Sequence, residues 1–251
     1  MDLELKGKVF IVTGGSRGLG FAAAGALVAE GAHVVIAGRD GQRAAQSAGQ
    51  LGDNVVGVAG NTADPTAPDR LIAVARDHYG RFDGILIGTG GPAAGTAASS
   101  TDTQWREAFD SVFLGPVRLA RKAAEQLAEG GVIAFVLSSS VYEPIPGLTV
   151  SNGLRPGLAG FAKSLADEVG PRGIRVVGLL PYRIYTQRAR EIDSLSGDSE
   201  EIRIRNSADL PLRRYGDPQE FGKVAAFLMS PAASYLTGVM VPVDGGGLKG
   251  F

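Results

Sequence analysis

The glycine-rich segment Thr13–Gly20 (TGGSRGLG) is the stretch of this sequence best suited to binding a ligand. It follows the apolar run Lys8–Thr13, which predicts a buried strand, and precedes an Ala- and Leu-rich helical pattern. Gly14 would allow a tight turn, Gly18 a close approach of the backbone to a pyrophosphate, and Gly20 close packing of the helix. This strand–turn–helix context predicts a dinucleotide site, and a glycine-rich turn without a ligand is the alternative. We expect cofactor contacts from Gly14, Ser16, Arg17, Gly18, Leu19 and Gly20.

The end of the second predicted strand indicates which dinucleotide is bound. A site for NAD(H) places an acidic residue there, about 20 residues after the glycines, for the ribose 2′-hydroxyl. Gly38 occupies that position, Arg39 follows it, and Arg17 lies in the facing loop. Two guanidinium groups around an uncharged position suit a 2′-phosphate, so we predict NADP(H). The alternative is that Arg39 and Asp40 only cap the next helix.

The remainder of the chain alternates short apolar runs with longer helical patterns. The apolar runs predict strands at Lys8–Thr13, His33–Ala37, Asn54–Ala59, Gly84–Ile87, Val132–Leu137, Ile174–Leu180 and Val239–Val243. Helices are expected at Phe21–Glu30, Gln42–Leu51, Asp69–Tyr79, Thr103–Ala128, Ser151–Val169 and Pro218–Leu228. Strands that are apolar throughout are buried on both faces, and their alternation with helices requires a parallel sheet.

We therefore expect an α/β fold in one domain over residues 1–251: a Rossmann-like, doubly wound parallel sheet of about seven strands with helices on both faces. The polar stretch 183–214 follows the sixth strand, at the edge of the sheet where ligands bind. We call it the lid segment, and we expect either a mobile lid or a solvated pair of surface helices.

Composition excludes several classes of function. The 251 residues carry 25 basic and 26 acidic side chains, a net charge of −1 that does not favour nucleic-acid binding. There is no cysteine, so we expect no disulfide and no thiolate metal site. No apolar run reaches the roughly 18 residues of a membrane span, and Met1–Lys6 is too charged for a signal peptide. We expect a cytoplasmic protein without a membrane partner or a metal.

The sequence resembles the short-chain dehydrogenase/reductase family over nearly its whole length. The resemblance rests on TGGSRGLG, on the strand arrangement, and on Leu236–Gly238 and Val243–Gly246 near the end. It implies that Asn61 and Thr62 flank the adenine and that Ile184 and Thr186, after Pro181, hold the nicotinamide amide. It also places Thr89 and Gly90 beside the cofactor, and it implies a homotetramer paired through the two long helices.

The sequence departs from the family where the family carries its catalytic residues. Val112 stands in place of an Asn, and Ser151 and Arg155 stand in place of the Tyr and Lys of Tyr-x-x-x-Lys. The catalytic Ser persists, with Ser138 as the best match in Ser138–Ser140. Further changes put Asn61 where an Asp is expected, Tyr182 where a Gly is expected, and Ile87–Gly90 in place of Asn-Asn-Ala-Gly.

These changes alter the chemistry that the site can perform. A Ser hydroxyl is far less acidic than a phenol, so Ser151 alone cannot protonate a carbonyl oxygen. Arg155 can still bind an oxyanion or a carboxylate, and the i, i+4 spacing puts both residues on one helix face. Pro156 disfavours helical geometry at Arg155, so we expect the helix start to be displaced. Arg155 could instead brace the acids of the lid segment.

Other side chains could complete the site. Tyr142, Tyr182 and Tyr185 are candidates for a displaced acid, although packing is the expected role of each. Arg155, Arg183 and Arg188 could converge, which would favour an anionic small-molecule substrate. The leading hypothesis is an NADP(H)-dependent oxidoreductase acting on a carbonyl or alcohol by an altered proton path. The rivals are a silent NADP(H)-binding sensor or structural subunit, and a non-redox enzyme that uses Arg155 and Ser138 as an oxyanion clamp.

Overall fold

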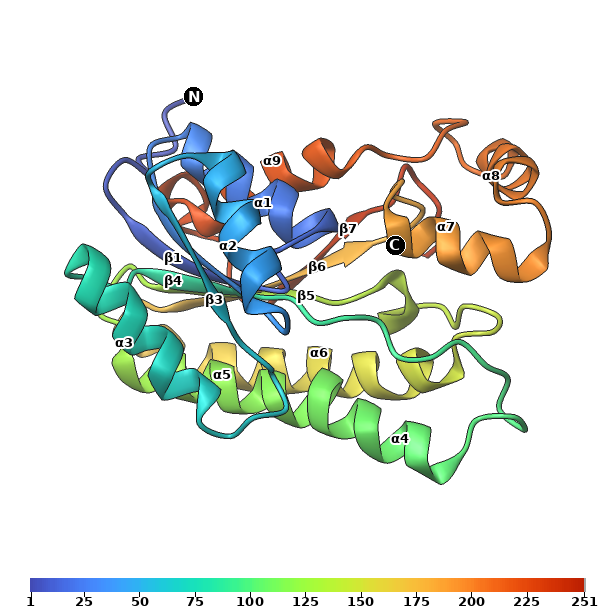
Figure 1. Cartoon of the computed structure of the whole chain (residues 1–251), viewed down its shortest axis with the longest axis horizontal. Helices are drawn as coiled ribbons and strands as arrows, with labels where there is room; N and C mark the ends of the chain where they lie inside the picture. The colour runs from blue at the N-terminus through green and yellow to red at the C-terminus, as the bar shows by residue number, and fades with distance from the viewer. Residues whose placement is uncertain (251) are drawn as a thin grey trace.

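Seven parallel strands form one sheet in the order β3-β2-β1-β4-β5-β6-β7. The structure is a computed structural model, and it describes residues 1–250. The strands are β1 Val9–Thr13, β2 His33–Gly38, β3 Val55–Ala59, β4 Gly84–Ile87, β5 Val132–Val136, β6 Arg175–Pro181 and β7 Val239–Val243. The order reverses between β1 and β4, which is the switch point of a doubly wound sheet (Figure 1). The predicted fold class is therefore confirmed.

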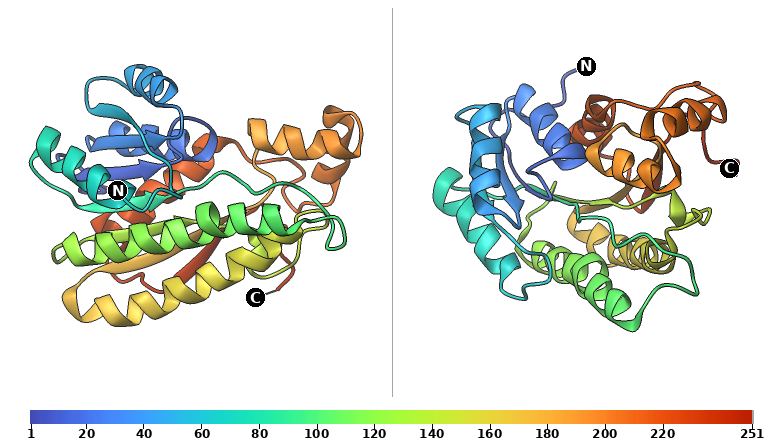
Figure 2. Two further views of the ribbon diagram at one scale, coloured as in Figure 1. Left: turned by 60° about the horizontal axis from the view of Figure 1, so that its bottom comes forward. Right: turned by 45° about the vertical axis from the view of Figure 1, so that its right-hand side comes forward.

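Helices cover both faces of the sheet (Figure 1, Figure 2). One face carries α1 Gly18–Ala29, α2 Gly41–Leu51 and α9 Pro218–Met229, and the other carries α3 Ala67–Tyr79, α4 Asp102–Ala108, α5 Gly115–Gln126 and α6 Thr149–Val169. The alternation of side chains along β1 explains both layers. Val9 and Ile11 pack with the core of α3, α5 and α6, whereas Phe10 and Val12 pack with that of α1 and α9.

The single helix predicted over Thr103–Ala128 is confirmed as a continuous helical run over 102–126, but its middle departs from α-helical geometry. Between α4 and α5 the chain forms a π-helical segment, Phe109–Leu114. A tertiary contact accounts for this wider turn: the Thr62 hydroxyl donates to the Ser111 carbonyl at 2.9 Å, and a methyl on Gly115 would lie 2.2 Å from the Thr62 carbonyl oxygen. Pro116 then begins α5 in a position where its missing N–H is tolerated.

The displacement expected for the helix predicted over Ser151–Val169 is wrong. The helix α6 begins at Thr149, two residues before the predicted start, and continues through Pro156. Its predicted end at Val169 is confirmed. Arg155 therefore keeps a helical position one turn after Ser151, on the face that the spacing predicts.

The lid segment folds into two short helices, α7 Gln187–Asp193 and α8 Ser199–Ala208, beyond the carboxyl ends of the strands (Figure 1). Its first helix is tied to the end of β6 by a buried acid. Asp193 is 3% exposed, and its carboxylate accepts hydrogen bonds from Arg183 Nη1 at 3.1 Å and from the Tyr215 hydroxyl at 3.1 Å. A buried polar cluster thus docks the end of α7, while the other side chains of α7 and most of those of α8 are exposed or half-buried.

Arg175 fixes the amino end of β6 to the helix beyond it. Its guanidinium donates to the carbonyl oxygens of Leu228 at 2.8 Å, Ser230 at 3.0 Å and Leu236 at 3.3 Å. Burial lowers the pKa of this group to about 10. The carbonyl oxygens lie at the end of α9 and just beyond it, so one side chain satisfies three acceptors that helical bonds leave open.

We predict that Arg175→Met lowers the free energy of unfolding by about 3 kcal/mol, because buried carbonyl oxygens lose their donors. Urea unfolding followed by circular dichroism measures the change. The control is Arg106→Met, which removes only an exposed pair with Asp102 and leaves stability unchanged. Equal midpoints for the two variants would contradict the structural role of Arg175.

Candidate active site at the carboxyl edge of the sheet

The turn after β1 has the geometry of a phosphate cradle. Gly14 and Gly18 have φ angles of 63° and 57°, which favour glycine. A methyl on Gly20 would lie 2.4 Å from the Gly14 carbonyl oxygen, so the start of α1 packs directly on the turn. No side chain caps α1, and the N–H groups of its first turn remain available for phosphate oxygens. The residues present therefore fit a dinucleotide.

The end of β2 explains the absence of an acid. A methyl built on Gly38 would lie 2.9 Å from Ser16 Oγ, so Ser16 fills the space that a larger side chain would need. Arg39 is exposed and makes no side-chain hydrogen bond or ion pair within residues 1–250, whereas Asp40 caps α2 by accepting from the Arg43 N–H at 3.1 Å. The capping alternative thus holds for Asp40 and leaves Arg39 available to a ligand.

The carboxyl ends of β1 and β4 are joined at the switch point. The Thr13 hydroxyl donates to the Gly88 carbonyl at 2.7 Å and accepts from the Gly88 N–H at 3.0 Å. This pair holds the phosphate loop beside the loop that carries Thr89 and Gly90. Thr89 in turn accepts a hydrogen bond from Arg155 Nη2 at 3.2 Å, which links the predicted cofactor and catalytic residues.

Arg155 is a buried cation without a counter-ion. Its side chain is 6% exposed, its Nη1 donates to the Val136 carbonyl at 2.7 Å, and its Nε has no acceptor in the described chain. No carboxylate within residues 1–250 pairs with it, so the hypothesis that it braces acids of the lid segment is wrong. Burial alone lowers the pKa of this guanidinium to about 10. The group still carries its charge at neutral pH, and an anion is the partner it lacks.

The predicted convergence of three arginines is not seen in their contacts. Arg183 pairs with Asp193, while Arg188 Nη2 donates to the Pro92 carbonyl at 2.7 Å. Of these three arginines, only Arg155 has no acidic partner in the described chain, so a preference of this cluster for an anion would rest on Arg155.

The serines lie around the end of β5 and the start of α6. Ser138 Oγ accepts from the Ser140 N–H at 3.1 Å, which leaves the Ser138 proton free to donate. Ser140 Oγ is buried without a partner in the described chain, and Ser151 is 7% exposed. Val112 lies in the π-helical segment and packs with Val150 and Leu154, so the position that the resemblance aligns with the family's Asn makes an apolar contact.

The segment after β6 approaches the phosphate loop. Ile184 is buried, and Thr186 caps α7 by accepting from the Ala189 N–H at 3.2 Å. A methyl on Gly18 would lie 3.8 Å from Thr186 Cγ2, so the residue predicted to hold the nicotinamide amide faces the cradle. The partly buried Pro181 ends β6 just before this segment.

The predicted adenine contacts are occupied within the chain. The Thr62 hydroxyl donates to Ser111, and Asn61 Oδ1 accepts from the Ala63 N–H at 3.2 Å. Both residues still follow β3 at the ligand edge, but their side chains first serve the local turn and the π-helical segment.

The candidate tyrosines pack among arginines or face solvent. The Tyr182 ring lies beneath the Arg183 guanidinium at 5.1 Å, and a methyl on Gly247 would meet it at 2.6 Å. Tyr185 is flanked by Arg190 at 5.5 Å and Arg203 at 5.3 Å. Tyr142 is 57% exposed. These contacts favour the packing interpretation for Tyr182 and Tyr185.

Two residues beside the site, Gln187 and Glu191, were missed by the sequence analysis. Gln187 accepts a hydrogen bond from Arg17 Nη1 at 3.2 Å, and its own Nε2 donates to Glu191 at 3.0 Å. Their i, i+4 spacing directly after Thr186 is a helical signal that could have indicated the pair. The contact with Arg17 spans 170 positions in the sequence and had no local signal.

Comparison with known proteins agrees with this geometry. A family model described as Enoyl-(Acyl carrier protein) reductase matches residues 14–247. Dehydrogenase/reductase SDR family member 4 of Homo sapiens is 32% identical over 249 residues, covering 96% of this chain and 88% of that protein. The chain belongs to the short-chain dehydrogenase/reductase family.

One further relative and one solved structure also match nearly the whole chain. The 3-oxoacyl-[acyl-carrier-protein] reductase FabG of Vibrio cholerae is 29% identical, with 97% of this chain and 98% of that protein covered. The L-sorbose reductase of Gluconobacter frateurii, solved in complex with NADPH and L-sorbose, superposes with a TM-score of 0.92 at 30% identity, and all of both chains is covered.

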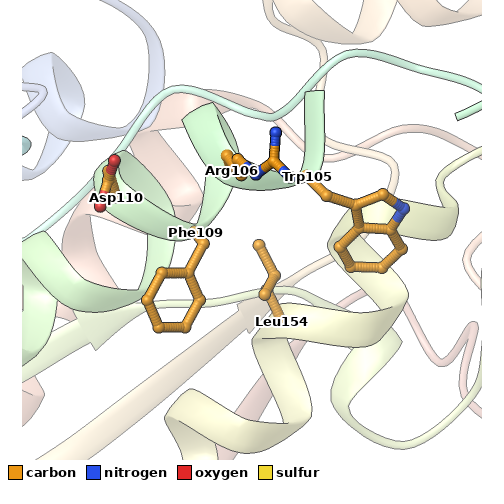
Figure 3. A pocket seen from close by; sticks show the side chains of 5 residues that line it. All are labelled: Trp105, Arg106, Phe109, Asp110 and Leu154. Carbon is orange, nitrogen blue, oxygen red and sulfur yellow. The ribbon is translucent and has the colours of Figure 1, made fainter. Parts of the chain in front are cut away.

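This short-chain dehydrogenase/reductase has a surface hollow that lies away from the phosphate loop. It has a volume of about 380 Å³ and lies between α4, the π-helical segment and α6 (Figure 3). Its lining is Trp105, Arg106, Phe109, Asp110 and Leu154. None of these is a predicted cofactor or catalytic residue, and the open, mostly apolar character of the hollow suits a protein contact better than a dinucleotide.

Within residues 1–250, no helix is both long and apolar enough to cross a membrane.

We predict that Gly20→Ala weakens dinucleotide binding about tenfold or more, because its methyl would displace the Gly14 carbonyl of the cradle. Calorimetric titration with NADP+ and with NAD+ measures the change. The affinity for both cofactors should fall, because both place their pyrophosphate on the phosphate loop. The control is Gly25→Ala in the same helix, whose methyl meets only Leu51 at 3.4 Å. Unchanged binding in Gly20→Ala would show that the cradle is not the phosphate site.

Proposed function

We propose that the protein is an NADP(H)-dependent oxidoreductase that acts on a carbonyl or alcohol substrate by an altered proton path. The observation that carries the proposal is the buried, unpaired Arg155 in contact with Thr89, one helical turn after Ser151. This contact supports an anion-binding role for Arg155 at the position that the sequence resemblance aligns with the family's Tyr-x-x-x-Lys pair, where the helix carries no phenol.

The preference for NADP(H) is supported at the 2′ position. Gly38 cannot be replaced by an acid without meeting Ser16, and two arginines, Arg39 directly after it and Arg17 in the phosphate loop, are exposed. The L-sorbose reductase named above was solved with NADPH, at 30% identity over its whole length. Two guanidinium groups would compensate the charge of a 2′-phosphate, and NAD(H) offers no such partner.

We predict a tenfold to hundredfold preference for NADP+ over NAD+, since one charge-assisted hydrogen bond contributes roughly 1.5–3 kcal/mol. Calorimetry with both cofactors measures it, and Arg39→Ala should remove most of the difference while leaving NAD+ binding intact. Arg43→Ala, which pairs with Asp40 on α2, is the control. Equal affinities in the unmodified protein would contradict the NADP(H) assignment.

The proposed chemistry divides the work among a few residues. The bound cofactor would supply hydride to the carbonyl carbon. The Ser138 hydroxyl, whose proton is free, would donate to the carbonyl oxygen and orient it. Arg155 would stabilise negative charge on that oxygen or on a neighbouring carboxylate, since its guanidinium is charged below a pKa of about 10.

The proton would then come from a source other than a tyrosine of the helix. Ser151 is too weak an acid to supply it, and Arg155 is a fixed cation at neutral pH. A bound water, or an acidic group of the substrate other than the carboxylate that pairs with Arg155, would supply the proton. A keto acid fits this site best, because its carboxylate would provide the counter-ion that Arg155 lacks.

We predict that the protein with NADPH reduces keto acids in preference to simple neutral ketones. Loss of a positioned general acid costs on the order of 10²–10⁴-fold, and neutral ketones have no means to offset that loss. Arg155→Leu should lower kcat/KM for keto acids by about 10²-fold or more, because the carboxylate loses a buried charge partner. Arg155→Lys, which keeps the charge without the planar fork, should retain part of the activity.

Loss of reduced-nicotinamide absorbance measures these rates. The KM for keto acids should rise as the pH passes about 10, because Arg155 loses its charge above that pH. Ready turnover of neutral ketones would overturn the altered proton path and would direct attention to Tyr142 or Tyr182. Absence of turnover with both keto acids and neutral ketones would instead support the rival hypothesis, a silent NADP(H)-binding sensor or structural subunit.

We also propose that the protein assembles as a homotetramer through α4, α5 and α6. Phe109 is 43% exposed on the apolar hollow of Figure 3 and stacks on Phe113 at 5.3 Å. A second copy would cover this surface. A monomeric mass in sedimentation at micromolar concentration would contradict the assembly.

A further inference from the structure

A continuous chain of side chains runs through α7 from the loop after β4 to the phosphate loop. Arg188 Nη2 donates to the Pro92 carbonyl at 2.7 Å, and Arg188 Nη1 pairs with Glu191 Oε2 at 3.6 Å. Glu191 Oε1 accepts from Gln187 Nε2 at 3.0 Å, and Gln187 Oε1 accepts from Arg17 Nη1 at 3.2 Å. The lid segment therefore contacts the two loops on either side of the sheet's switch point.

The contacts of Gln187 fix the orientation of its amide. An amide nitrogen donates and an amide oxygen accepts, so the bond to Glu191 turns Oε1 toward Arg17. Arg17 offers five N–H donors and uses one nitrogen, Nη1, in this contact. Its other N–H groups remain available for phosphate oxygens, so Gln187 and a phosphate can share this guanidinium.

The helix that carries Gln187 is anchored at both ends. At its start, Thr186 caps the helix and faces Gly18 of the phosphate loop. At its end, the buried carboxylate of Asp193 holds Arg183 and Tyr215. An acceptor on such a fixed element restricts the rotamers of Arg17 before any ligand arrives.

We propose that Gln187 is a positioning residue for cofactor selection: it holds the Arg17 guanidinium at the phosphate loop, so that the lid segment contributes to the choice of NADP(H) over NAD(H). This inference rests on the proposed function. It differs from direct recognition by Arg17 and Arg39, because Gln187 acts through Arg17. Gln187 should therefore influence only the cofactor that carries the phosphate.

The test is calorimetric titration of Gln187→Leu with NADP+ and with NAD+. Leucine keeps much of the side-chain volume and removes the acceptor, so NADP+ affinity should fall about threefold to tenfold while NAD+ affinity stays the same. Glu191→Ala should change the ratio of the two affinities in the same direction, because it releases the Gln187 amide. The matched control is Gln50→Leu, an exposed glutamine on α2 without a side-chain hydrogen bond within residues 1–250, which should leave both affinities unchanged.

The inference is overturned if Gln187→Leu leaves the ratio of NADP+ to NAD+ affinity unchanged, including the case in which both affinities fall equally. A purely structural role of Gln187 would lower the affinity for both cofactors by the same factor. If the unmodified protein shows no preference for NADP+, the proposed cofactor is wrong and the inference fails with it. The two failures are distinguished by the unmodified protein measured in the same series.

Discussion

The close approach of β1 and β4 at the switch point determines where every other part of the site lies. Thr13 joins the two strand ends through both atoms of one hydroxyl group, and the turn that follows packs against Gly20 at the start of α1. Only glycine allows the backbone to lie this close to Gly88 at position 14 and to Gly14 at position 20. Because the loops of β1 and β4 diverge from this point, a ligand bound there would meet both, and the segments after β5 and β6 follow at the same edge of the sheet.

Two buried arginines differ in how fully their hydrogen bonds are satisfied. Burial lowers the pKa of Arg155 and of Arg175 to about 10. Arg175 donates to three carbonyl oxygens that α9 and the segment after it leave open, so its burial stabilises the fold. Arg155 has two acceptors and an Nε without one. Burying the Arg155 guanidinium at the carboxyl edge of the sheet incurs a desolvation cost that a bound anion would offset.

The strands, the phosphate loop and the layer arrangement could be predicted because each depends on local patterns. Apolar runs such as Val9–Thr13 identify buried strands, and the glycine spacing identifies the turn. The π-helical segment could not be predicted, since it depends on the contact of Thr62 with Ser111, 49 residues apart. The partners of Arg183 and Arg188 likewise depend on how the lid segment docks. At Pro156 the local rule predicted a displacement, whereas the packing of α6 maintains the helix.

The central claim is that Arg155 binds an anionic group of the substrate in place of the family's tyrosine and lysine. A crystal structure with NADPH and a non-reacting keto-acid analogue such as oxamate tests it most directly. The account predicts a carboxylate or carbonyl oxygen within hydrogen-bond distance of Arg155 Nε, with the Ser138 hydroxyl on the reacting oxygen. A substrate analogue bound elsewhere, with Arg155 Nε still lacking an acceptor and a tyrosine hydroxyl on the reacting oxygen, would contradict it.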